Sequence, residues 1–246
     1  MALIPEVVDP TLAAIDRELE RRAALEPRRS YLGASAIGDE CERKLWYSIR
    51  QEVPRKPFDA ASLKRFEDGH RGEAVMAERL RMVPGVELWT VDEQTGGQIG
   101  GTLFDGRFGW HVDGVIRGLL QAPLTPHVWE HKQVGQKKYD ELRKLKSTVG
   151  EKAALAAWDP VYYAQGVLYM ELMDLTRHYL TVSTPGGREF DSCRTEPNPV
   201  MAKALLAKAK RILSAGEAPA RLSERPEFFK CKWCDFRGAC HGIAAF

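Results

Sequence analysis

The sequence predicts an α/β domain in which helices flank a mixed β-sheet. Three observations favour this fold class. Helical patterns occupy the first third of the chain, and short segments rich in β-forming residues follow between residues 86 and 134. Helix then alternates with a strand pair, an order typical of a mixed sheet. Hydrophobic residues make up 44% of the 246 residues, which is enough to bury one sizeable core.

Helices are expected throughout the N-terminal third of the chain. Residues 9–25 should form the first helix, because an aspartate cap precedes a proline that suits a first turn. A second helix is expected to start near residue 35 and to run through residues 41–47. Residues 51–60 resemble a loop, and residues 61–81 have the pattern of a long amphipathic helix that Pro84 and Gly85 bring to an end.

Strands are expected next, because short runs rich in β-forming residues are separated by glycine or proline turns. The expected strands are 86–91, 98–104, 107–116 and 127–134. The remaining elements are expected to be a helix at 136–146, a capped helix at 161–175, a hairpin at 178–193 and a helix at 199–214. The last thirty residues are rich in cysteine and irregular in pattern.

The chain is expected to consist of a helical extension, residues 1–34, and one domain, residues 35–246. No apolar run approaches the ~18–20 residues that a bilayer-spanning helix needs, so no membrane partner is expected. The first twenty residues are acidic and lack a basic stretch followed by an apolar core, which argues against a signal peptide. A cytoplasmic location is therefore expected.

Bulk charge does not identify a partner. The formal net charge is +2 and the pI is about 8.2, whereas strong nucleic-acid binders often exceed ~9. Phosphate contacts would have to come from local basic clusters, although each cluster is equally well explained as a solvated helix face. The clusters are Lys137-Lys138, Arg143-Lys144-Lys146 and Lys203/Lys208/Lys210/Arg211.

Four of the five cysteines suggest a metal site that links the two ends of the chain. Cys231, Cys234 and Cys240 form a C-x2-C-x5-C pattern, and Cys41 lies far upstream. In a cytosolic chain, a tight C-x2-C is more often a metal or redox site than a disulfide. Four thiolates can hold zinc or an iron–sulfur cluster, so a structural clasp is expected. Cys41 taken alone could equally be an ordinary thiol, and Cys193, on an expected strand, is interpreted as one.

A candidate active site lies on the expected strands. Glu130 and Lys132 are two apart in a strand and therefore share one face, while His131 points to the other. Asp113 is expected on a neighbouring strand. Two carboxylates can hold Mg²⁺ or Mn²⁺, and the lysine can orient water or stabilise charge on a phosphate. Acidic-x-Lys triplets are common by chance, so the pattern gains weight only from further features.

Three further positions could join this site. His70, expected in the middle of a helix, could add a nitrogen ligand, and Glu73 three residues later is a weaker candidate ligand. Gln165 and Tyr169 are four apart on an expected helix and share a face, from which they could contact a nucleotide or metal-bound water. Chance polar positions remain an alternative explanation for each.

Together these motifs resemble the PD-(D/E)XK nuclease superfamily, from about Ser35 to Cys240. The combination is closest to the RecB-like branch that carries an iron–sulfur cluster, which includes the AddB nuclease domain and the CRISPR-associated exonucleases. The motifs that carry the resemblance are Cys41-Glu42-Arg43-x-x-Trp46-Tyr47, Gly69-His70, Asp113, Glu130-x-Lys132, Gln165-x-x-x-Tyr169 and Cys231-x2-Cys234-x5-Cys240. The first aspartate follows valine where the family pattern has proline.

The resemblance implies a restriction-endonuclease-like core and a phosphodiester hydrolase, most simply an exonuclease on single-stranded DNA or DNA ends. It implies that His70, Asp113 and Glu130 bind one or two Mg²⁺ or Mn²⁺ ions, that Lys132 is catalytic, and that Gln165 and Tyr169 form the glutamine-tyrosine motif. It also implies that the four cysteines hold a [4Fe–4S] cluster, zinc being the less favoured occupant.

By analogy, such a chain acts in recombination, repair or phage DNA processing in a bacterial or phage-infected cell, with a separate helicase or recombinase as partner. No G-x4-G-K-[ST] motif is present. Trp46, Tyr47, Trp233 and Phe236 are expected to pack around the clasp, with base stacking as the alternative. A non-catalytic DNA-binding factor with a degenerate site remains the rival function. Cleavage polarity, exonuclease or endonuclease mode, DNA or RNA preference and oligomeric state are left open.

Overall fold

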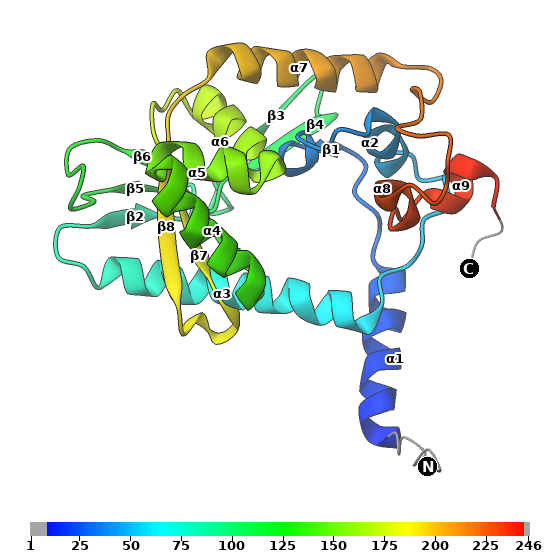
Figure 1. The fold of residues 1–246 in the computed structure, drawn as a ribbon, viewed down its shortest axis with the longest axis horizontal. Coiled ribbons are helices and arrows are strands. Elements are labelled where there is room, and N and C mark those ends of the chain that lie inside the picture. Colours follow the sequence, from blue (N-terminus) through cyan, green and yellow to red (C-terminus); the bar gives the residue numbers. More distant parts are fainter. Residues whose placement is uncertain (1–8, 244–246) are drawn as a thin grey trace.

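The computed structural model describes residues 9–243 and places helices around two β-sheets (Figure 1). The helices are α1 (Pro10–Leu25), α2 (Glu42–Ser48), α3 (Ala60–Arg81), α4 (Gln136–Val149), α5 (Glu151–Trp158), α6 (Pro160–Met173), α7 (Pro199–Ser214), α8 (Phe229–Lys232) and α9 (Arg237–His241). The strands are β1 (Leu32–Gly33), β2 (Glu87–Trp89), β3 (Gly100–Leu103), β4 (Phe108–His111), β5 (Gly114–Arg117), β6 (His127–Gln133), β7 (His178–Ser183) and β8 (Phe190–Thr195).

The central sheet has the strand order β2-β5-β6-β7-β8. Strands β6 and β7 run parallel, and the other neighbours are antiparallel, so the expected mixed sheet is confirmed. Trp129 on β6 packs with Met76 of α3. Val128, which points to the opposite face, packs with Leu168 of α6. Helices therefore cover both faces, and β6 is the middle strand of the sheet.

A second sheet, ordered β1-β4-β3, lies beside the first. The sequence pattern suggested one strand over residues 107–116, and this was wrong. The chain forms β4 and β5 instead, which belong to different sheets, with Val112 and Asp113 between them. Val112 is fully buried and holds the junction in the core. The break places Asp113 between two sheets.

Two other expectations need correction. Residues 35–47 do not form one helix: a 3-10 turn at Ala34–Ala36 is followed by α2, for which Cys41 is the N-cap. Helix α5 was missed, because α4 and α5 are separated only by Gly150 at a positive φ of 84°. The aspartate caps were right: Asp9 accepts hydrogen bonds from the first turn of α1, and Asp159 does the same for α6.

The C-terminal helices α8 and α9 lie beside α2 (Figure 1). The rings of Tyr47 and Phe236 are 5.7 Å apart and both are buried. The backbone N–H of Lys56 donates to the carbonyl of Asp235 at 2.9 Å. These contacts join segments from opposite ends of the sequence. Across residues 9–243, no helix is both long enough and apolar enough to span a membrane.

Candidate active site

Asp113, Glu130 and Lys132 come together in one hydrogen-bonded group. The Nζ of Lys132 donates to Oε2 of Glu130 at 2.9 Å, since both side chains leave the same face of β6. The backbone N–H of Asp113 donates to Oε1 of Glu130 at 3.3 Å. The N–H of His131 donates to Oδ2 of Asp113 at 2.8 Å. The three side chains therefore lie as the strand pattern required, even though Asp113 lies just outside a strand.

Gln165 and Tyr169 join the group from α6. The Nε2 of Gln165 donates to Oε2 of Glu130 at 3.0 Å and to the hydroxyl of Tyr169 at 3.1 Å. Gln165 is 5% exposed and Tyr169 is 2% exposed. The two residues share a helix face, as expected, and both are buried. In this arrangement they hold the carboxylate in place.

The group opens into a cleft of about 980 Å³ between α3 and the two sheets. Its lining includes Asp113, Lys132, Gln165 and Tyr169, and α3 contributes His70 and Glu73. His70 lies exposed on the helix, in the expected middle position. Residues from four separate stretches of sequence therefore face a common space.

The carboxylate of Asp113 repels those of Glu130 and Glu73. Burial and, as the next cause, the charge of Asp113 raise the pKa of Glu130 to about 8. Burial likewise raises the pKa of Glu73 to about 7, with Asp113 as the next cause. Burial lowers the pKa of Lys132, but the charges of Glu130 and Asp113 outweigh it, so the net shift is upward and the ammonium group stays charged.

This crowding fits a divalent cation. The carboxylate of Asp113 acts electrostatically on those of Glu73 and Glu130, and carboxylates are oxygen ligands of the kind that Mg²⁺ and Mn²⁺ prefer. Within residues 9–243, however, no three His, Cys, Asp or Glu side chains already stand close enough to hold a metal ion. Ion binding would therefore require the carboxylates to shift from their present hydrogen bonds.

Positive charge in the cleft comes from arginines that sequence reasoning missed. Arg29, Arg65 and Arg81 line it, and none has a carboxylate partner in the described part of the chain. The guanidinium of Arg29 lies 5.0 Å from the ring centre of Tyr31, which also lines the cleft. The residues are scattered along the chain, so only the fold brings them together.

Several cations of the clusters noted in the sequence bond within the fold. They are Lys138 to Asp159, Lys146 to Asp191, Lys208 to the carbonyls of Ile37 and Asp39, and Arg211 to Glu42. These four are structural cations, an explanation that neither interpretation of the clusters included.

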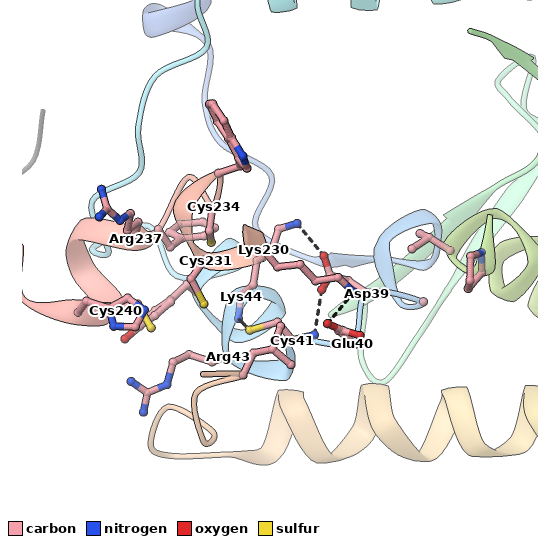
Figure 2. Close-up of a pocket in the computed structure, with 18 residues that line it drawn as sticks. Asp39, Glu40, Cys41, Arg43, Lys44, Lys230, Cys231, Cys234, Arg237 and Cys240 are labelled. Atoms are coloured by element: carbon pink, nitrogen blue, oxygen red, sulfur yellow. Dashed lines mark hydrogen bonds and ion pairs between the residues drawn. The ribbon is translucent and has the colours of Figure 1, made fainter. Parts of the chain in front are cut away.

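The four cysteines of the expected clasp line one cavity of about 420 Å³. Figure 2 shows Cys41 at the start of α2 facing Cys231, Cys234 and Cys240 from the C-terminal segment. Burial raises the pKa of Cys231, and the charges of Cys240 and Cys41 raise it further. Cys193 lies apart, fully buried on β8, as expected of an ordinary thiol.

The aromatic residues near the cysteines differ from one another. Tyr47 and Phe236 are buried, and half-buried Trp46 donates its indole N–H to the carbonyl of Ala215 at 2.9 Å. Packing was the right interpretation for these three. It was wrong for Trp233, which is 80% exposed.

No protein-family model matches the sequence. No curated protein matches it either. Among solved structures, an alkaline exonuclease (LHK-Exo) from Laribacter hongkongensis superposes with a TM-score of 0.51 at 14% identity, covering 80% of this chain and 91% of that chain. The same exonuclease in complex with dAMP gives a TM-score of 0.49 at 15% identity, with the same coverage.

The crystal structure of SSO0001 covers 97% of this chain and 99% of its own, with a TM-score of 0.49 at 12% identity. At such low identity, the likeness to the alkaline exonuclease at a TM-score of 0.51 establishes a similar fold, a mixed α/β arrangement with helices flanking the sheets.

Proposed function

We propose that this chain is a metal-dependent deoxyribonuclease of the PD-(D/E)XK superfamily, acting as an exonuclease on single-stranded DNA or DNA ends. One observation carries the proposal: Asp113, Glu130 and Lys132 share a hydrogen-bonded group in an arginine-lined cleft. The fold likeness to an alkaline exonuclease supports it. The RecB-like branch with a cysteine clasp remains the nearest group by motif.

The residues fit hydrolysis of a phosphodiester bond. A divalent cation, when bound, supplies charge neutralisation at the phosphate and lowers the pKa of a water ligand. Asp113 and Glu130 would hold it, with His70 or Glu73 from α3 as the third ligand. Lys132, buried and charged, orients the attacking water and stabilises the negative charge that develops on the phosphate. Gln165 keeps Glu130 in the orientation that this requires.

The cleft suits a polyanion. Arg29, Arg65 and Arg81 form no ion pair with a carboxylate within residues 9–243, so their guanidinium groups can bind phosphate groups. These cations balance the acidic centre, which would otherwise repel DNA. A separate helicase or recombinase would supply opened strands, and recombination, repair or phage DNA processing would be the setting.

The cysteine cavity is proposed to hold a [4Fe–4S] cluster with a structural role. Four thiols lining one cavity are a suitable donor set. Such a cluster is wider than a single zinc ion, so its ligands lie farther apart. The cluster would lock α8 and α9 against α2.

The decisive experiment is an end-labelled digestion series with Mn²⁺, on single- and double-stranded DNA. Lys132→Ala and Asp113→Ala should each lower the cleavage rate by at least about 100-fold. Lys152→Ala, an exposed cation on α5 that pairs with Glu196, is the matched control and should cleave normally. Equal cleavage by all variants would indicate a contaminant and would favour a non-catalytic DNA-binding factor. The same series reports polarity and mode.

A further inference from the structure

The C-terminal segment exposes two aromatic rings, each beside a lysine. Trp233 is 80% exposed and Phe229 is 62% exposed. The Nζ of Lys232 lies 5.4 Å from the ring centre of Trp233, and the Nζ of Lys230 lies 5.6 Å from that of Phe229. Exposed aromatic side chains that gather in one patch mark a binding surface, whereas scattered ones do not. Lys230 already forms an ion pair with Glu40 at 2.6 Å, so Lys232 is the ammonium group beside these rings that favours an anionic partner.

This surface continues toward the cleft through the loop before α3. Residues 54–57 and Cys234-Asp235 line a common pocket. The backbone of Lys56 bonds to Asp235, as described above, and the charge of Asp235 acts on Arg55. Figure 1 shows this loop passing beside α9 as it leads into α3. The exposed rings and the start of α3 therefore belong to adjoining surfaces.

Two more aromatic rings carry the surface into the cleft. The guanidinium of Arg55 lies 4.3 Å from the ring centre of Phe58. Phe58 supports Phe66 edge-on, with ring centres 5.0 Å apart. Phe66 is 46% exposed and, with Arg65, lines the cleft that contains Asp113. A cation again accompanies each aromatic ring.

We propose that Phe229, Trp233, Phe58 and Phe66 form an aromatic track that guides a single nucleic-acid strand from the C-terminal segment to the catalytic cleft. Unpaired bases stack on the rings, and Lys232, Arg55 and Arg65 contact the phosphates. The bases of a duplex are already stacked and paired, so the track selects single strands. That the guided strand is also the substrate rests on the proposed nuclease function.

The test measures binding of fluorescent oligothymidylates to the full chain, by anisotropy in EDTA so that no cleavage occurs. A short oligonucleotide of about four residues spans the cleft alone, and one of about sixteen reaches the C-terminal segment. Trp233→Ala and Phe229→Ala should each weaken binding of the long strand by about five-fold or more and leave the short strand unaffected. Phe66→Ala should weaken both. Heparin, a polyanion without bases, should bind all variants equally.

Phe190→Ala is the matched control, because Phe190 is also exposed and lies beside an arginine, Arg79, but does not line the cleft. Circular dichroism checks that each variant is folded. Unchanged long-strand binding in Trp233→Ala and Phe229→Ala would overturn the track and leave an acidic protein as the partner of this surface. An inactive wild type whose binding still depends on Trp233 would refute the nuclease function but not the track.

Discussion

Gln165 on α6 donates its Nε2 to Oε2 of Glu130 on β6 at 3.0 Å, and the same nitrogen reaches the hydroxyl of Tyr169. Glu130 is 1% exposed, so its carboxylate depends on protein donors for its orientation. The helix that covers the sheet therefore supports a side chain whose other partners are Lys132 and the backbone of Asp113.

Replacing Gln165 tests this support. Gln165→Ala removes a buried donor from Glu130, and we expect cleavage to slow by about ten-fold or more. Tyr169→Phe removes only the hydroxyl that accepts from Gln165, so its effect should be smaller. Single-turnover kinetics with Mn²⁺ measure both. Full activity in Gln165→Ala would mean that Lys132 alone orients Glu130.

Metal binding should stabilise the fold. The repulsion that raises the pKa of Glu130 and Glu73 is relieved by a cation, and a ligand at 100 times its Kd contributes about 2.7 kcal/mol. Adding Mn²⁺ should therefore raise Tm by several degrees. Asp113→Asn should melt higher than wild type without metal and lose the Mn²⁺ shift. Differential scanning fluorimetry measures Tm in both proteins. An equal rise in Tm on adding Mn²⁺ to wild type and to Asp113→Asn would mean that the ion binds elsewhere.

The clasp has its own spectroscopic test. An anaerobic preparation should be brown with a broad visible absorption band, and Cys234→Ser should be paler and less stable. Closing the long loop between Cys41 and the C-terminal cysteines contributes roughly 5 kcal/mol on the chain-entropy estimate. Cys193→Ala is the control that keeps its colour, because Cys193 does not line the cavity. A colourless protein with stoichiometric zinc would contradict the iron assignment.

Acid should destabilise the fold through His178. Within residues 9–243, neither of its buried ring nitrogens has a hydrogen-bond partner, and burial lowers its pKa to about 3. The unfolded chain takes up the proton near pH 6.5, so the folded state loses stability as the pH falls from about 6.5 toward 3.

At pH 5 this loss is about 2 kcal/mol. His178→Leu should reduce the difference in unfolding free energy between pH 7 and pH 5, measured by urea titration. His70→Gln, at an exposed position, should leave the difference unchanged. An unaltered pH profile in His178→Leu would assign the acid sensitivity to other groups.

Features that depend only on residues close together in the sequence, such as helix caps and strand faces, could be predicted from the sequence. The caps at Asp9 and Asp159 and the shared face of Glu130 and Lys132 follow from hydrogen bonding and strand geometry within a few residues. The break at Val112 could not be predicted, because the alternating pattern continues through it and only the separation of the two sheets reveals it.

Only some of the groupings of residues that lie far apart in the sequence could be predicted before the fold was known. The cysteines and acidic residues carry recognisable spacing, so they could be grouped before the fold was known. Arg29, Arg65 and Arg81 have no common spacing, and their role depends on how α3 and β1 meet. Trp233 was misjudged because an aromatic residue between two cysteines suggests packing, whereas the short helix α8 turns it outward.

The cavity that joins Cys41 to the C-terminal cysteines has a consequence for biosynthesis. Cys41 leaves the ribosome early, but its three partners follow only after the rest of the sheet and its helices have been translated. A chain stalled or cut before residue 231 would lack the whole second side of the cavity. The proposed cluster could therefore assemble only after the C-terminal segment has been made, and a chain that ends before residue 231 would not hold it.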